Sequence, residues 1–329
     1  MTTSPSAAQV LALCGGIGGA KLALGLYRVL KPEQLAVIVN TGDDFEHLGL
    51  SISPDLDTLL YTLGGLADPE RGWGRAHETW EFMRALGQLG GETWFQLGDR
   101  DMAVHIERSQ WLRDGKSLSS FAEHVCRKFG IGARVLPMSD SAVRTIVETD
   151  EGSLPFQHYF VRRRCEPLVQ AIGFRGAAEA APAPGLLNLM ADPSLQAIVI
   201  CPSNPYLSVD PILALPGVAA ALAMAQAPVI AVSPIIGGKA VKGPLAKIMA
   251  ELGLSVTNES IVAHYRGVID AFVIDEADAA DRDRIDLPVL VTHTLMRDMV
   301  DRERLAAEVI AFARTLVEPH AMSLAGECR

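Results

Sequence analysis

Residues 10–40 read VLALCGGIGGAKLALGLYRVLKPEQLAVIVN, and this stretch decides the fold. An apolar run, a glycine-rich turn, a segment with helical spacing and a second apolar run follow one another within it. Short apolar runs separated by helices are typical of a buried parallel sheet with helices on its faces. The stretch therefore predicts a strand–turn–helix–strand unit of an α/β protein.

The same alternation returns in the second half of the chain. Apolar runs that predict four further strands lie at 197–201, 229–232, 271–274 and 289–291. Because helical spacing separates these runs, with one helix expected from about 210 to 225, we expect them to extend the same parallel sheet. We interpret 8–70 and 186–320 as one Rossmann-like core with helices on both faces of the sheet, which binds a nucleotide or a diphosphate.

The middle of the chain has a different pattern. Helical spacing occurs at 77–89 and 119–129, and strand-like alternation occurs at 145–148 and 158–162. These segments do not follow the regular strand–helix rhythm of the rest of the chain. We interpret 71–185 as an inserted subdomain of helices and a small β-sheet on the parallel-sheet platform.

The composition excludes several classes of partner. The 329-residue chain has a formal net charge of −10, and its longest basic run is the three arginines at 162–164. Nucleic acids and anionic membranes need a basic surface, so neither is expected as a partner. No signal pattern and no membrane-length apolar run is found, which predicts a soluble, cytoplasmic protein. The five cysteines are scattered without a CxxC pair, so neither a disulfide framework nor a zinc site is expected.

The turn GGIGGAK at 15–21 is suited to phosphate. It follows the first strand, and ligands of an open parallel sheet bind beyond the carboxyl ends of the strands. Glycines allow close backbone approach, and the start of the next helix offers free N–H groups. The turn fits neither a Walker A loop nor a dinucleotide fingerprint, because Lys21 stands at the third glycine position and the second strand ends at Asn40 without an acid. The alternative is a turn needed only for tight packing.

An acidic cluster follows the second strand. Asp43 and Asp44 stand in NTGDD, and Asp55 and Asp57 follow in SPDLD, where they point the same way if that segment is extended. Adjacent carboxylates repel one another unless a cation is present, and oxygen ligands favour Mg²⁺ or Mn²⁺ over zinc. We therefore expect a metal site. The alternative is that single acids serve as turn or cap residues, as Asp55 would before the helical stretch 56–63.

Two later loops are expected at the same edge of the sheet. PSNPYLS at 202–208 offers Ser and Asn side chains and a helix start, although turn formation and capping alone also explain these residue types. SPIIGGKAVKGP at 233–244 again combines glycines with lysines. Lysines on loops are usually solvated, so only their place beside three other candidate loops favours a role in binding. Together the four loops favour a metal-bridged diphosphate over a nicotinamide.

Seven motifs in order resemble one family, the 2-phospho-L-lactate transferases (CofD/FbiA). Besides GGIGGAK, NTGDD, PSNPYLS and SPIIGGKAVKGP, they include SPDLDTLLYTLGG at 53–65, RGWG at 71–74 and LGDRD at 97–101. The similarity extends from about residue 10 to residue 300. Each motif alone is weak, whereas seven in this order are specific.

The resemblance implies a Mg²⁺-dependent phosphotransferase. Such enzymes move a phosphorylated acid, of the 2-phospho-L-lactate, phosphoenolpyruvate or 3-phosphoglycerate type, from a guanosine diphosphate carrier to the deazaflavin alcohol Fo. The products are F420-0 or its dehydro form, and GMP. The resemblance also implies a Rossmann-like homodimer in which the inserted subdomain contributes to the acceptor site.

The motifs further imply roles for individual residues. Those at catalytic positions are Asp43, Asp44 and Asp57, and the same three with Asp55 are expected to contact the metal. Those expected to bind the acceptor are Asp55, Thr58, Arg71 and Trp73. Those expected to bind the donor and its phosphates are Gly15, Gly16, Gly18, Gly19, Lys21, Ser203, Asn204, Ser208, Gly237, Gly238, Lys239 and Lys242.

Two alternatives remain open from the sequence. YvcK-type proteins, which are related nucleotide-sugar-binding regulators, carry a GGGTG-type first loop, whereas this chain has GGIGGAK and the PDLD acids. A nicotinamide-dependent oxidoreductase is disfavoured by Lys21 and Asn40. Binding of Fo would separate the transferase from both.

Overall fold

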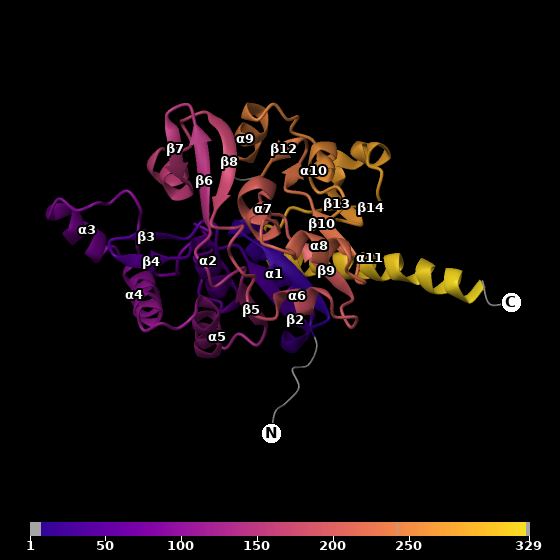
Figure 1. Ribbon diagram of the computed structural model, residues 1–329, viewed down its shortest axis with the longest axis horizontal. Coiled ribbons are helices and arrows are strands. Elements are labelled where there is room, and N and C mark those ends of the chain that lie inside the picture. Colours follow the sequence, from indigo (N-terminus) through magenta and orange to yellow (C-terminus); the bar gives the residue numbers. More distant parts are fainter. Residues whose placement is uncertain (1–7, 242, 327–329) are drawn as a thin grey trace, which may run out of the picture.

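A seven-stranded parallel sheet forms the centre of the computed structural model, which describes residues 8–241 and 243–326. The strands lie in the order β14–β13–β10–β9–β1–β2–β5 (Figure 1). Their bounds are β1 Val10–Cys14, β2 Leu35–Val39, β5 Arg134–Pro137, β9 Ala197–Ile200, β10 Val229–Val232, β13 Ala271–Asp275 and β14 Val289–Thr292. The predicted α/β class and Rossmann-like sheet are confirmed.

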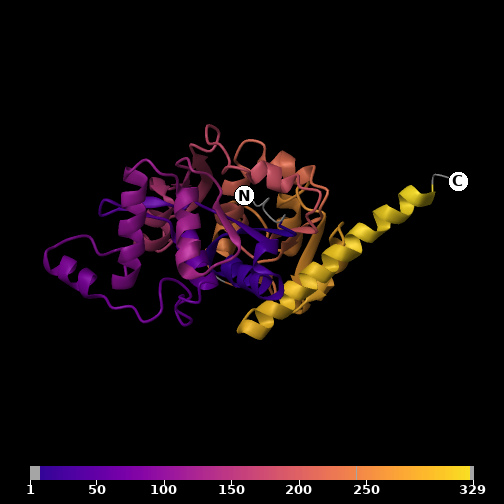
Figure 2. The same ribbon diagram turned by 90° about the horizontal axis from the view of Figure 1, so that it is seen from below.

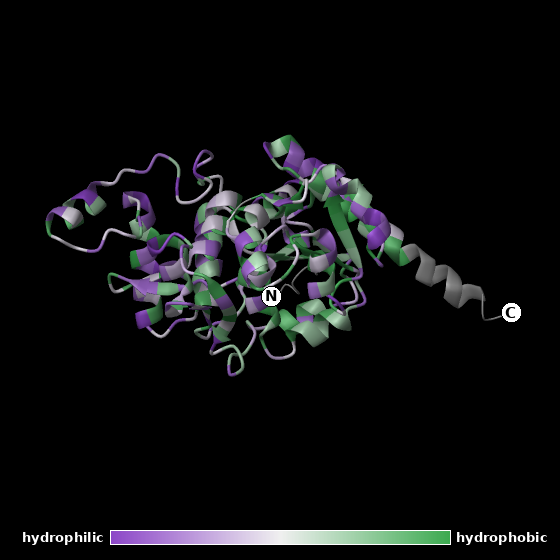
Figure 3. Ribbon diagram, turned by 90° about the horizontal axis from the view of Figure 1, so that it is seen from above, coloured by the Kyte–Doolittle hydropathy of each residue, from purple (hydrophilic) through white to green (hydrophobic). Residues whose placement is uncertain are grey.

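Helices cover both faces of this sheet, which explains why its strands are continuously apolar. One face packs against α1 (Gly16–Val29), α2 (Pro54–Leu63), α5 (Leu118–Phe129) and α11 (Met299–Gly326). The other packs against α6 (Leu186–Met190), α7 (Asp210–Leu213), α8 (Val218–Ala223), α9 (Leu245–Glu251) and α10 (Asn258–His264). In β1, Val10 and Ala12 face the first layer, and Leu11 and Leu13 face the second. The strands are accordingly mostly green in Figure 3, while the outer helices carry both colours.

The strand order reverses between β1 and β9. From β1 the chain extends the sheet through β2 to β5, and it then returns to β9 and extends the other side through β10, β13 and β14. Ligands of open parallel sheets bind in the crevice at such a reversal, beyond the carboxyl ends of the strands. The turns after β1 and β9 are therefore the first places to look for a site.

Most of the middle of the chain lies beside the central sheet and its two helix layers (Figure 1). An antiparallel sheet has the order β7–β6–β8, and β3 pairs with β4 in a hairpin. The bounds are β3 Phe45–His47, β4 Leu50–Ile52, α3 Glu81–Gln88, α4 Asp99–Arg113, β6 Arg144–Thr149, β7 Gly152–Pro155 and β8 Val169–Arg175. The small elements are η1 Pro32–Gln34, η2 His158–Arg162, η3 Pro205–Val209, β11 Ile235–Ile236, β12 Lys239–Ala240 and η4 Glu276–Arg284.

Three details differ from the sequence-based expectations. The division of the chain at 71 and 185 stays a prediction, but β5 lies inside that range and pairs with β2 in the central sheet. Residues 158–162 form a helical turn and not a strand, because the apolar centre of HYFVR also suits one turn that buries Tyr159. The helix expected from 210 to 225 is interrupted at Gly217, whose φ of 81° no helix accommodates.

Helix α11 closes the first layer and then continues beyond the rest of the molecule (Figure 2). A Cβ atom at Gly25 of α1 would lie 2.1 Å from the carbonyl oxygen of Arg302, so the absence of a side chain there allows the two helices to touch. No helix in the described part of the chain is both long and apolar enough to cross a membrane.

Candidate active site

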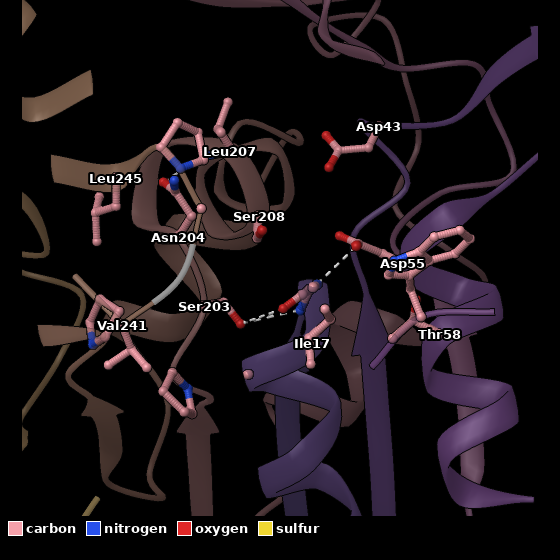
Figure 4. A pocket seen from close by; sticks show the side chains of 18 of the residues that line it. Ile17, Asp43, Asp55, Thr58, Ser203, Asn204, Leu207, Ser208, Val241 and Leu245 are labelled. Carbon is pink, nitrogen blue, oxygen red and sulfur yellow. Dashed lines mark hydrogen bonds between the residues drawn. The ribbon is translucent and has the colours of Figure 1, made fainter. Parts of the chain in front are cut away.

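A cavity of about 650 Å³ opens at the reversal point of the sheet. Its walls come from the turn after β1, the segments after β2 and β9, the loop after β10, and the segment 294–296 that follows β14. Aromatic residues of the middle segment complete it. Figure 4 shows the two sides of this cavity, with the start of α1 between them.

The turn after β1 is fastened to the turn after β9. The backbone N–H of Gly15 donates to Ser203 Oγ at 3.3 Å, and that hydroxyl donates to the Gly15 carbonyl at 2.8 Å. A Cβ at Gly15 would lie 2.5 Å from Ser208 Cβ, and one at Gly18 would lie 2.4 Å from the Pro202 carbonyl oxygen. Tight packing thus explains these two glycines. It leaves the first turn of α1, whose N–H groups have no partner within the helix, facing the cavity.

Two carboxylates, those of Asp43 and Asp55, lie on the same side of the cavity and point into it (Figure 4). Asp55 accepts hydrogen bonds from the Gly16 N–H at 2.8 Å and from Asn40 Nδ2 at 2.9 Å. Asp43 is buried, and its Oδ1 has no hydrogen-bond partner among the described residues. Burial raises the pKa of both groups, and the neighbouring charge of Asp55 raises the pKa of Asp43 further. A buried acid pair with an unpartnered oxygen fits a hard cation such as Mg²⁺.

The other two predicted acids lie elsewhere. Asp44 accepts a hydrogen bond from Ser53 Oγ at 2.7 Å and lines a smaller neighbouring cavity, not the large one. Burial raises the pKa of Asp44 to about 7, against the opposing effect of the Arg144 charge.

Asp57 lies in neither cavity. It forms a bidentate ion pair with Arg108, with N–O distances of 2.7 and 2.9 Å, and both residues are buried. Arg108 also donates to the Ser51 carbonyl at 3.1 Å. The metal and catalytic roles of Asp57 stay predictions, and this geometry is that of a structural ion pair.

The predicted donor-binding residues divide into those that line the cavity and those that the structure places elsewhere. Those that line the cavity are Gly15, Gly16, Gly18, Lys21, Ser203, Asn204 and Ser208. Lys21 Nζ donates to the Met296 carbonyl at 2.9 Å. Gly19 is packed against Cys14 and Ser203, and Lys239 is exposed.

In the glycine loop after β10, the backbone N–H groups already bind an acid of the protein itself. The N–H groups of Gly237 and Gly238 donate to the two oxygens of Asp278, at 2.8 and 2.7 Å. These two N–H groups do not face the cavity, which the same loop reaches through Ile236 and Val241. Lys242 lies outside the described residues.

Four aromatic side chains of the middle segment line the cavity and are called the aromatic wall. They are Trp73, Phe95, Phe156 and Phe160. The rings of Phe156 and Phe160 stack, with centroids 5.3 Å apart and an angle of 11° between the planes. Three predicted acceptor residues, Asp55, Thr58 and Trp73, line the cavity, whereas Arg71 packs its guanidinium over the Trp80 ring at 4.6 Å.

Several residues of the site were not predicted. Asn40, taken as a missing ribose-binding acid, positions Asp55. The segment 294–296 directly follows the last strand, so the rule that singled out the loops after β1, β2, β9 and β10 would have found it as well. Phe156 and Phe160 carry no such signal, because they come from the antiparallel sheet and the helical turn beside it.

The geometry can be compared with known proteins. A family model described as 2-phospho-L-lactate transferase CofD matches residues 10–312. The chain belongs to this family. The CofD-family chain is 41% identical to the phosphoenolpyruvate transferase of Streptomyces griseus over 305 residues, which cover 91% of this chain and 95% of the relative. It is 40% identical to the 2-phospho-L-lactate transferase of Methanosarcina mazei over 299 residues, which cover 90% and 97%.

A solved structure supports the fold. The crystal structure of a UPF0052-family protein from Bacillus halodurans has a TM-score of 0.59 and 15% identity, and the match covers 94% of this chain and all of that one. At this identity the likeness shows a shared fold and no more.

The CofD family model and its named relatives make the chain a phospho-acid transferase of coenzyme F420 biosynthesis. This finding disfavours the two alternatives left open by the sequence, a YvcK-type regulator and a nicotinamide-dependent oxidoreductase.

Proposed function

We propose that this CofD-family enzyme transfers a phosphorylated three-carbon acid from a guanosine diphosphate carrier to Fo, with Mg²⁺ as cofactor. The observation that carries the proposal is the composition of one cavity. It joins the start of α1, two neighbouring carboxylates and an aromatic wall. These features suit a diphosphate, a divalent cation and a planar ring, respectively.

The donor diphosphate would bind at the start of α1. There the positive end of the helix dipole faces the cavity beside Ser203, Asn204 and Ser208. The Ser203 hydroxyl donates to the Gly15 carbonyl, which fixes the turn. Asn204 Oδ1 accepts from the N–H groups of Tyr206 and Leu207, which orients its NH2 group as a donor. Preorganised donors of this kind stabilise charge on a phosphoryl group without reorganisation.

The acceptor would lie with its ring against the aromatic wall. Trp73 and Phe160 are 41% and 39% exposed, which is high for large apolar side chains and leaves ring surface for a ligand. The ribityl chain of Fo would then extend toward Asp43 and Asp55. Alignment of its primary hydroxyl with the phosphorus is a large part of what such a site can contribute to the rate.

In the reaction the hydroxyl oxygen of Fo bonds to the phosphorus that carries the acid, and the bond from that phosphorus to the bridging oxygen breaks, which releases GMP. Within the described residues Asp43 and Asp55 are the only carboxylates that line the cavity, so they are the available acceptors for the hydroxyl proton. They would also hold Mg²⁺, whose chemistry is to neutralise charge on the diphosphate.

Product analysis tests the proposal directly. The purified protein would be incubated with Mg²⁺, Fo and each of the three guanosine diphosphate-linked acids, and the products would be identified by mass spectrometry. We expect one acid to give GMP and the matching F420-0 product, and riboflavin to give none. Equal turnover of riboflavin would contradict the deazaflavin assignment. The homodimer stays a prediction, which light scattering would test.

A further inference from the structure

A second, smaller cavity adjoins the first and is called the side pocket here. Its volume is about 250 Å³, and it shares Asp43, Phe156 and Gln157 with the large cavity. Its remaining walls are the segment after β2 and one end of the antiparallel sheet. This volume is below the range of about 300–1,000 Å³ usual for whole ligands, so the side pocket suits one end of a molecule that extends from the large cavity.

Two arginines stand side by side in the wall of the side pocket. Arg144 of β6 and Arg175 of β8 are directly opposite in the antiparallel register, and both line the pocket. Like charges in opposed positions destabilise a sheet. Across residues 8–241 and 243–326 neither guanidinium forms an ion pair, and Arg144 donates one hydrogen bond of 2.7 Å to the Val143 carbonyl. Asp44 and Glu46 line the same pocket, and the Arg144 charge lowers the pKa of Asp44, but within the described residues neither acid forms an ion pair with either arginine. Most of the N–H donors of the pair are therefore left for an anion from outside the chain.

The walls of the side pocket next to the two arginines suit a short carbon chain that ends in a carboxylate. Planar guanidinium groups match a carboxylate with two parallel hydrogen bonds. Ile146, Pro155 and Phe156 supply apolar surface next to the arginines. On the shared wall Asp43 Oδ1 has no hydrogen-bond partner among the described residues, so the junction of the two cavities is polar.

We propose that Arg144 and Arg175 bind the carboxylate of the acid under transfer, while its phosphorus lies in the large cavity beside Asp43. The inference rests on the proposed function and deepens it, because it assigns the part of the site that recognises the acid. It adds no chemical step. It predicts that the enzyme distinguishes a donor with a free carboxylate from one in which that group is masked.

Binding measurements test this assignment. Calorimetry in the presence of Mg²⁺ would compare the lactate-linked guanosine diphosphate donor, its carboxamide analogue, and plain GDP. We expect the wild-type protein to prefer the carboxylate donor by about 10- to 100-fold, the range for hydrogen bonds to charged groups. In Arg144→Gln and Arg175→Gln this preference should disappear, with the affinities for GDP and Fo unchanged.

Two controls separate the possible failures. Arg113→Gln, which removes an exposed arginine from α4, should keep the preference, and the melting temperature of Arg175→Gln should be unchanged or raised, because an opposed charge is lost. If the two site variants keep the preference, or lose GDP affinity equally, the side-pocket assignment is wrong. If the wild-type protein neither binds the donor nor forms a product with Fo, the proposed function is wrong and the assignment falls with it.

Discussion

Replacement of Arg108 by Met should destabilise the protein strongly, because it strands a buried charge. The side chain is fully buried, and its two short bonds to Asp57 neutralise that carboxylate. Removal of one partner of a buried ion pair costs about 3–5 kcal/mol. Two hydrogen bonds to a charged group, at about 1.5–3 kcal/mol each, give a similar figure. This loss is a large fraction of the total stability of a typical domain, about 5–15 kcal/mol.

Urea unfolding of four proteins measures the effect. We expect Arg108→Met to lower the free energy of unfolding by about 3–5 kcal/mol. The double variant Arg108→Met/Asp57→Leu should recover most of this loss, because it replaces the ion pair with apolar groups. Arg113→Met, an exposed change on the same helix, should stay within about 0.5 kcal/mol of the wild type. A loss below about 1 kcal/mol for Arg108→Met, or no recovery in the double variant, would refute the reasoning.

The double variant also decides between two roles for Asp57. If the ion pair is structural, the folded double variant should still turn over Fo, since Asp57 does not line the cavity. If Asp57 is the catalytic or metal-binding residue predicted from the motif, turnover should fall by orders of magnitude although the protein is folded.

Three further perturbations have expected outcomes. Asp43→Asn should cut turnover by orders of magnitude and abolish the rise in melting temperature that we expect Mg²⁺ to cause in the wild type; full activity after EDTA treatment would exclude the metal role. Burial raises the pKa of Asp44 from 3.8 to about 7, so the folded state binds that proton more tightly than the unfolded state does. In metal-free protein the free energy of unfolding should therefore fall as the pH rises from about 4 to about 7. Asp44→Asn should reduce this slope in pH-dependent unfolding, and the raised pKa values of Asp43 and Asp55 account for the remainder. Gly25→Ala should lower the melting temperature, since a Cβ would lie 2.1 Å from the Arg302 carbonyl oxygen; an unchanged value would mean that α11 shifts freely.

Local pattern predicted most strands of the sheet and failed where the apolar run was very short. The strands β1, β2, β9, β10, β13 and β14 are apolar runs and were all predicted. Strand β5 was missed because it is only four residues long and includes an arginine and a proline, which leaves two apolar residues as its signal. The loops at the carboxyl edge followed from strand direction alone, since parallel strands bring their ends to one side.

The spacing of residues in the sequence did not predict the directions in which the acidic side chains point. Asp55 and Asp57 would point the same way in an extended segment, but α2 begins at Pro54. Two residues along a helix differ in direction by about 200°, so one acid reaches the cavity and the other reaches Arg108. The glycines of the loop after β10 present a similar case, because Asp278 lies 40 residues further along the chain and occupies their N–H groups.

The charged residues of the large cavity predict that the proposed diphosphate donor needs the metal more than the proposed acceptor Fo does. Among the described residues Lys21 is the only Lys or Arg that lines it, and its amine donates to the Met296 carbonyl. An anionic diphosphate that approaches Asp43 and Asp55 is repelled unless a cation or a proton compensates these acids. Fo carries no diphosphate, so the repulsion that it meets is smaller.

Donor affinity should therefore depend on Mg²⁺ far more than acceptor affinity does. Calorimetry with GDP and with Fo, each with Mg²⁺ and with EDTA, would measure the difference without turnover. Asp43→Asn should narrow it, because removal of one carboxylate weakens the repulsion that the cation offsets. Equal GDP affinity with and without Mg²⁺ would show that the start of α1 and the polar groups of the β9 turn suffice for the diphosphate. The two acids would then serve the hydroxyl of the acceptor alone.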